Sequence, residues 1–217
     1  YVPENMTLVI VGDFDEGATT DLVEQYFGRA ESDSYERPER TQEPEQTAFR
    51  GWSEAADNEQ SHLRVGFHIP HATHDDVPAL DLLGAIMGYG DASHLYQTIQ
   101  REKQLVNAVN SGAYTPGDAG LFMISTQYQL PDEGRTHLDV YRAILKEVFR
   151  FRNVRVSDME LQRARTIIES QEIYGKQTAQ GLAMKLGRYQ MVTGDPLYEQ
   201  EYYEALREVT PSDIKRV

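Results

Sequence analysis

The clearest candidates for metal chemistry are three histidines in the pattern His68-x-x-His71-x-x-His74, which two aspartates follow directly. Imidazole and carboxylate groups are common zinc ligands. Pro70 lies inside the pattern, so these imidazoles leave the end of a strand and enter a loop instead of sharing one helix face. We interpret the segment as a strand exit followed by a helix cap, with adventitious metal binding as the alternative. No metal ligand is assigned.

A hydrolytic zinc site needs three protein ligands and an open fourth position, and a helical His-x-x-Glu-His motif is one way to supply two of the ligands and the base. None of the six histidines is arranged in this way. The absence of cysteine excludes a thiolate nucleophile, a cysteine-ligated metal and a disulfide framework. We therefore assign no catalytic residue and predict that this chain by itself is inactive as a zinc hydrolase.

The segment 91–109 carries a more specific pattern. Its apolar residues, among them Leu95, Tyr96 and Leu105, are spaced as in Ser-Arg-Leu-Phe-x-x-x-Arg-Glu-Lys-x-Gly-Leu-x-Tyr. That pattern belongs to the pitrilysin/insulinase family of zinc metallopeptidases, which are inverzincins, and the chain resembles this family.

The resemblance implies substrate binding by polar residues of the same segment. An ungapped overlay puts the family's Arg at Gln100 and its Tyr at Asn107. The family's two side chains could polarise a peptide carbonyl or stabilise an oxyanion, whereas Gln and Asn donate hydrogen bonds without the charge of Arg or the rigid reach of Tyr. Arg101, one position later, could compensate in part. The alternative is that Gln100 and Asn107 are ordinary polar residues at a helix end and a strand start.

Hydrophobic periodicity and turn signals predict the elements that must position these side chains. Alternation and β-branched runs predict strands at about 6–12, 47–54, 62–69, 106–114 and 120–129. Helical spacing and capping signals predict helices at about 15–27, 75–88, 91–103, 132–151, 157–174, 177–192 and 196–208. Ser157 and Glu160 have the spacing of a capping box, and Thr210 begins one further helix. The proline-containing segment 32–46 is predicted to be a surface loop.

In each half of the chain, strands come first and helices gather behind them. This order predicts one α+β domain over residues 1–217, with helices packed on one face of a largely antiparallel sheet. Because Tyr1 is not an initiator methionine, we expect the chain to be a fragment of a longer multidomain protein.

The charge balance limits the classes of partner. With 35 acidic and 21 basic residues the formal net charge is −14, which disfavours nucleic acid because such binding depends on Lys and Arg contacts to phosphate. No apolar run reaches the roughly 18 residues of a transmembrane helix, so we predict no membrane insertion.

The family resemblance also covers segments 1–13, 120–124 and 209–214, in the expected order. The chain is therefore similar to the second, non-catalytic domain of a peptidase half-shell, with a mitochondrial-processing-peptidase-like metallohydrolase fold. The resemblance implies a zinc-dependent metalloendopeptidase parent whose two half-shells enclose a peptide in a clamshell chamber. This chain would form chamber wall and an interdomain interface, and acids that face inward would favour basic peptides.

Cofactor and partners follow from the same resemblance. It implies zinc in the parent chain and none in this fragment, and as partners the zinc-bearing domain of the same chain, a second half-shell or homodimer, and a peptide substrate. It favours a periplasmic or organellar setting. Two alternatives stay open: a scaffold or assembly domain of a catalytically dead family member, or an independent metal enzyme built on His68, His71 and His74.

Overall fold

The computed structural model describes residues 2–29, 36, 39, 41, 43–130 and 134–217. The chain divides into two compact units, residues 1–57 and residues 58–217. The prediction of one domain over 1–217 stays a prediction.

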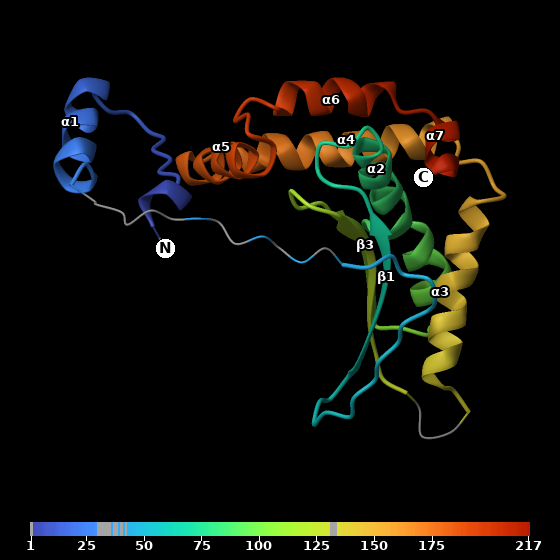
Figure 1. Cartoon of the computed structure of the whole chain (residues 1–217). Coiled ribbons are helices and arrows are strands. Elements are labelled where there is room, and N and C mark those ends of the chain that lie inside the picture. The colour runs from blue at the N-terminus through green and yellow to red at the C-terminus, as the bar shows by residue number, and fades with distance from the viewer. Residues whose placement is uncertain (1, 30–35, 37–38, 40, 42, 131–133) are drawn as a thin grey trace. The chain divides into compact units, whose positions relative to one another are not determined.

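The first unit contains a short 3-10 helix, η1 (Pro3–Asn5), and one α-helix, α1 (Glu16–Phe27), drawn in blue in Figure 1. Asp15 starts α1 because its carboxylate accepts a hydrogen bond from the amide of Ala18 at 2.8 Å. This confirms the helix predicted at 15–27.

The strands predicted at 6–12 and 47–54 are wrong, since neither segment forms a strand. A strand exists only where a second strand pairs with its backbone amides and carbonyls, and the described part of the first unit contains no paired strand. The predicted surface loop 32–46 lies in large part outside the described residues.

The second unit is built on an antiparallel sheet of β1 (Ser61–Ile69), β2 (Ala108–Tyr114) and β3 (Gly120–Tyr128), in the order β1-β3-β2. The three strands predicted in this half of the chain are confirmed. Its helical elements are α2 (Val77–Gly88), the π-helix η2 (Tyr96–Glu102), α3 (His137–Phe151), α4 (Asp158–Gly175), α5 (Ala179–Thr193), α6 (Glu199–Glu208) and α7 (Pro211–Arg216).

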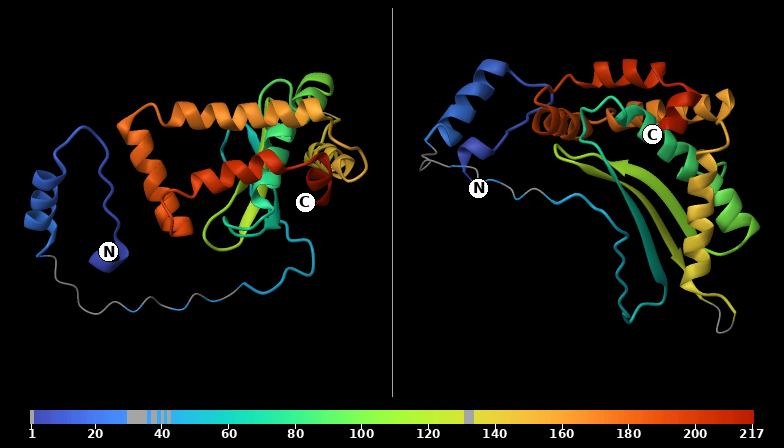
Figure 2. Two further views of the ribbon diagram at one scale, coloured as in Figure 1. Left: turned by 90° about the horizontal axis from the view of Figure 1, so that it is seen from above. Right: turned by 45° about the vertical axis from the view of Figure 1, so that its right-hand side comes forward.

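The helices cover one face of this sheet. Along β3 the side chains of Phe122, Ile124, Thr126 and Tyr128 alternate with more exposed ones and are buried. Helices α2 and α3 stand against that face, and α4 and α6 cross one end of the sheet (Figures 1 and 2). The predicted α+β fold, with helices packed on one face of an antiparallel sheet, is confirmed.

Two glycines let α2 lie directly on β2. A Cβ atom on Gly84 would stand 3.0 Å from the Cα of Gly112, and one on Gly88 only 2.2 Å from the amide nitrogen of Ser111. The buried Ser111 hydroxyl donates a hydrogen bond to the Gly84 carbonyl at 3.0 Å. The contact between α2 and β2 therefore requires glycine at these places.

Local caps set most helix starts. The Ser157–Glu160 capping box begins α4 and a corresponding box of Thr210 and Asp213 begins α7, as predicted. The helix predicted at 132–151 begins only at His137, because Thr136 donates its amide proton to the carboxylate of Asp139 at 2.8 Å. Residues 132 and 133 of that prediction lie outside the described residues.

Within the described ranges, none of the helices combines the length and the apolar composition that a bilayer crossing requires.

Candidate functional site

The segment with the family-like pattern folds as a π-helix that leads into β2. In η2 the amide of Lys103 donates to the carbonyl of Thr98, five residues earlier, at 3.2 Å. Leu95 and Ile99 are fully buried and hold this helix on the core. A π-turn holds one residue more than an α-turn, and such turns are rare and occur often at functional sites.

The predicted substrate-binding residues lie on and just after this π-helix. Gln100 is half-buried within it, and Arg101 is exposed, with one guanidinium nitrogen 3.4 Å from the Oε1 atom of Gln97. Asn107 is exposed, and its backbone amide donates to the carbonyl of Gln127 at 2.7 Å, so it extends the pairing of β2 with β3. No hydrogen bond links the side chain of Gln100 or Asn107 to another described residue.

The end of η2 needs an unusual backbone. Gln104 has a φ of +48°, the left-handed conformation that glycine adopts most easily, and the next amide, of Leu105, donates to the carbonyl of Ile99 at 2.9 Å. In the ungapped overlay the family pattern has Gly at the position of Gln104. Gln104 thus adopts the left-handed backbone conformation at the position where the family pattern has glycine.

The three histidines do not form one group that could hold a metal, although the rings of His71 and His74 meet edge to face with their centroids 5.9 Å apart. His68 is exposed on β1, and His71 lies in the following turn with its Nδ1 atom 3.1 Å from the Thr73 hydroxyl. The Nδ1 atom of His74 accepts a hydrogen bond from the amide of Asp76 at 3.1 Å, just before α2 begins. His74 therefore closes the turn that leads into α2. Among the described residues no three His, Asp or Glu side chains form a group that could hold a metal ion.

The aspartate at the N-cap position of α2 has a different partner. Asp76 stands at the N-cap position but its side chain makes no capping hydrogen bond. Its carboxylate instead accepts a hydrogen bond from Arg216 of α7 at 2.5 Å. Tertiary contact with α7 has replaced the local cap.

A cavity of about 580 Å³ opens between α2, α4, α5 and α6, and sequence reasoning missed it. At its wall, Tyr202 of α6 donates its hydroxyl proton to the carboxylate of Asp81 on α2 at 2.7 Å. Burial raises the pKa of Asp81 to about 6, although the hydrogen bond from Tyr202 and the charge of Arg188 oppose this change. The available signal was one acid within the otherwise apolar run Val77–Gly88.

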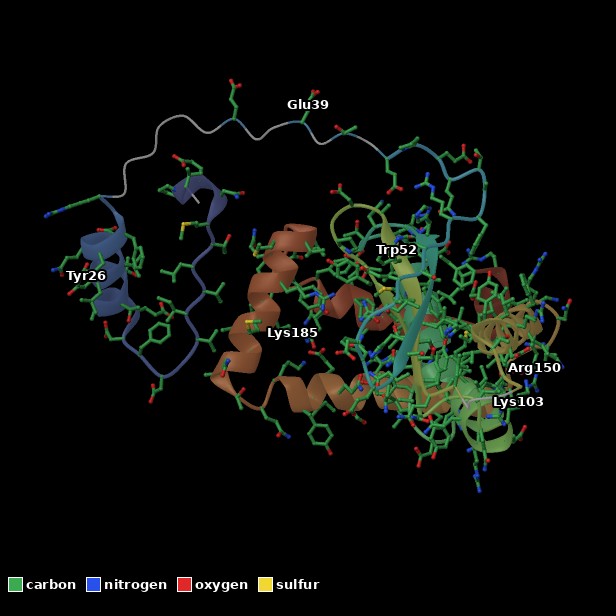
Figure 3. The ribbon with its side chains drawn as sticks, turned by 90° about the horizontal axis from the view of Figure 1, so that it is seen from below. Tyr26, Glu39, Trp52, Lys103, Arg150 and Lys185 are labelled. Carbon is green, nitrogen blue, oxygen red and sulfur yellow. The ribbon has the colours of Figure 1, made fainter. Side chains whose placement is uncertain are left out.

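Four charged side chains beside this cavity fasten α5 to its neighbours. Lys185, which stands on α5 (Figure 3), pairs with Glu172 of α4 and with Glu199 of α6, the latter at 2.8 Å. Lys176 pairs with the same two glutamates. Burial lowers the pKa of Lys185, although its hydrogen bond to Glu199 opposes this. Since each charge is matched by an opposite one, this cluster holds the helices together.

Comparison with known proteins identifies the chain. The sequence model of the family described as "Peptidase M16 inactive domain" matches residues 1–168. The chain belongs to the Peptidase M16 inactive domain family. The resemblance drawn from segment 91–109 is thereby confirmed.

Curated relatives of this M16 domain include zinc proteases. An uncharacterized zinc protease of Streptomyces coelicolor is 25% identical over 161 residues, covering 73% of this chain and 34% of the relative. Mitochondrial-processing peptidase subunit alpha-2 of Dictyostelium discoideum is 26% identical over 229 residues, covering 100% of this chain and 48% of the relative. The chain thus spans between a third and a half of the length of the curated relatives that it matches.

Solved structures share the fold of the M16 domain. A protease from Helicobacter pylori matches with a TM-score of 0.83 at 19% identity, over 95% of this chain and 49% of that one. A chain of complex III2 from Candida albicans matches with a TM-score of 0.62 at 15% identity, over 74% of this chain and 39% of that one. At these identities the likeness concerns the fold alone.

Proposed function

We propose that this chain is the non-catalytic domain of a zinc-dependent metalloendopeptidase that degrades peptides in a clamshell chamber. In this role it forms part of the chamber wall and an interface with the zinc-bearing domain of the same parent chain. The observation that carries the proposal is the match of the M16 inactive domain family over residues 1–168. The greater length of the zinc-protease relatives supports the presence of a further domain in the parent.

The zinc belongs to that other domain in our proposal. The sequence of this chain lacks His-x-x-Glu-His, and the described residues contain no group of three side chains suited to a metal. We expect the chain alone to be inactive as a peptidase.

Arg101 is our proposed substrate-gripping residue, with Asn107 beside it. The Arg-Glu-Lys of the family pattern also matches Arg101, Glu102 and Lys103 once one residue is inserted before it, and the Gly and Tyr of the pattern stay at Gln104 and Asn107 when the one residue between its Lys and Gly is left out. A π-turn absorbs one inserted residue, and η2 spans this place. Gln100 is then the inserted residue, and the exposed guanidinium of Arg101 supplies the charge that the ungapped overlay had lost.

Partners and setting are proposed on the family alone. The Dictyostelium relative is named as one subunit of a peptidase, which supports pairing of this half-shell with a second one or with a copy of itself. The proposed setting is periplasmic or organellar.

The test measures peptide hydrolysis by this chain alone and by the parent chain, each with zinc and after zinc is removed by a chelator. Hydrolysis by the zinc-loaded parent only is the expected result. Zinc-dependent hydrolysis by this chain alone would contradict the proposal. A parent that is inactive in the presence of zinc would contradict it as well.

The alternative function is that of a scaffold or assembly domain of a catalytically dead family member. It is supported by the occurrence of the same fold in a chain of complex III2 from Candida albicans. The parent sequence separates the two functions, since the scaffold requires that the zinc-binding motif be missing from the parent as well.

A further inference from the structure

The sheet face that α2 and α3 leave open carries its side chains in rows across the three strands. In one row Arg64 of β1 stands opposite Ser125 of β3, and Ser125 stands opposite Asn110 of β2. Directly opposed residues of antiparallel strands have Cβ atoms about 4.5–5.5 Å apart, so the three side chains form one set. Guanidinium, hydroxyl and amide groups are all hydrogen-bond donors.

The neighbouring row extends this set of donors. His62 of β1 stands opposite Gln127 of β3. A shallow cavity of about 200 Å³ lies over these two rows, with Arg64, Asn110 and Ser125 in its lining. The polar end of the open face is therefore hollowed where its donors meet.

The open face differs from the rest of the chain in charge. The three strands contain no Asp or Glu, although the chain has 35 acidic residues. Arg64 is exposed and makes no ion pair with any residue that the structure describes. None of the acidic residues of the chain therefore belongs to the strands that form this face.

A row that contains two glycines separates the hydrogen-bond donor rows from an apolar end of the sheet face. In the next row Met123 of β3 stands between Gly66 of β1 and Gly112 of β2. A Cβ atom on Gly112 would meet nothing within 4 Å, so space is open above this row. Beyond it Leu121 stands opposite Tyr114.

We propose that Arg64, Ser125 and Asn110 bind a side-chain carboxylate of an extended peptide, and that an apolar side chain two residues along lies over Met123 between the two glycines. Side chains of an extended peptide that point to one face recur every second residue, which is also the spacing between successive rows along a strand. The planar fork of Arg suits a carboxylate, and the hydroxyl and amide complete its hydrogen bonding. The inference rests on the proposed function, in which this face contacts the peptide substrate.

The test compares the affinities of three short fluorescent peptides for the 217-residue chain by anisotropy. They contain Glu-x-Leu, Gln-x-Leu or Lys-x-Leu in an otherwise identical neutral sequence. We expect the Glu peptide to bind about tenfold more tightly than its Gln twin, and the Lys peptide to bind most weakly.

Substitutions locate the effect. Arg64→Gln is expected to remove the preference for Glu, so that the Glu and Gln peptides bind with similar affinity, while Arg64→Lys keeps part of the preference. The matched control Arg152→Gln removes an exposed charge at the C-cap of α3, outside the three strands, and should leave the preference intact. Circular dichroism of each variant establishes that it is folded, and Ser125→Ala serves if Arg64→Gln is not.

Three outcomes would overturn the inference. They are equal binding of the Glu and Gln peptides, an equal loss in the Arg152→Gln control, and binding of no peptide at all. Equal binding leaves the proposed function in place, because it concerns only the choice between peptides. The hydrolysis assay on the parent chain tests the proposed function separately.

Discussion

Tyr202 on α6 donates a hydrogen bond of 2.7 Å to Asp81 on α2, although 121 positions separate the two residues in sequence. The bond ties the C-terminal helices to the helix that packs on β2. Burial raises the pKa of this carboxyl group to about 6 although the hydrogen bond opposes the change, so the ionised form of Asp81 has a cost at neutral pH.

Asp81→Asn should change how the stability of the protein depends on pH. Asp81 binds its proton more tightly in the folded state, with a pKa of about 6, than in the unfolded chain, with an ordinary value near 3.8. The contribution of protonated Asp81 to the stability of the folded state is complete below about pH 4 and is lost as the pH rises through 6. The free energy of unfolding of the variant relative to wild type should therefore rise by about 1–3 kcal/mol between pH 4 and pH 7.

Urea unfolding at a series of pH values measures this difference. Asp91→Asn is the control, since Asp91 is exposed and its carboxylate has no described partner. A difference that stays constant with pH, or that matches the control, would show that Asp81 is not a costly buried charge.

Glu160→Gln should change the pH dependence of stability in the opposite direction from Asp81→Asn. Burial works against the charge of Glu160, but the side chain and amide of Ser157 and the ring of His94, at 2.6 Å, donate to its carboxylate and together lower its pKa to about 2. The stabilisation is present above an ordinary pKa of 4.5 and is lost as the pH falls toward 2. Because the group is partly solvated, we expect a loss of about 1–2 kcal/mol at pH 7.

The measurement is chemical unfolding at pH 7 and again near the acid limit of the folded state. Glu204→Gln on α6 is the matched control, because Glu204 is exposed and has no described partner. If the Glu160→Gln variant is as stable as the control at pH 7, the hydrogen bonds of Glu160 with Ser157 and His94 do not stabilise the fold as we expect.

Gly88→Ala should destabilise the second unit. A Cβ atom there would stand 2.2 Å from the amide nitrogen of Ser111, so either α2 or β2 has to move. We expect a loss of about 1–3 kcal/mol or more. The control is Gly175→Ala, since a Cβ atom on Gly175 would meet nothing within 4 Å at the end of α4. Thermal unfolding of both variants checks this, and equal melting temperatures would contradict the close contact.

Arg101→Gln in the parent chain should lower kcat/KM for peptide hydrolysis by about tenfold, if a charge-assisted hydrogen bond to the substrate is lost. Gln100→Ala should have little effect, because we propose that Gln100 is the residue that the π-turn absorbs. Steady-state kinetics on both variants, with Arg152→Gln as a charge control, decide between the two residues. A larger loss for Gln100→Ala would support the ungapped overlay instead.

Local signals predicted the elements well where neighbouring residues alone create them. The Ser157–Glu160 box starts α4 because its hydrogen bonds join residues three apart. The alternation in Ser61–Ile69 predicted β1 because one face of that strand packs on the core. The strands at 6–12 and 47–54 were predicted wrongly because β-branched composition favours a strand but provides no partner for it.

The candidate site was only partly predictable. Gln100, Arg101 and Asn107 were predicted from a pattern of residue types, but that pattern does not reveal the π-turn on which our proposal for Arg101 rests. Asp81 was missed because its burial depends on helices that come together from distant parts of the chain.

The sequence by itself determined the absence of cysteine and of His-x-x-Glu-His, the helix caps and the three strands of the sheet, because these depend on residue identity and on bonds between near neighbours. Only the tertiary structure decided that Asp76 binds Arg216, that Tyr202 reaches Asp81, and that Arg64 joins Ser125 and Asn110 on an open face. These relationships join residues far apart in the chain. Strand register and helix packing select such partners, and no local pattern of residues encodes them.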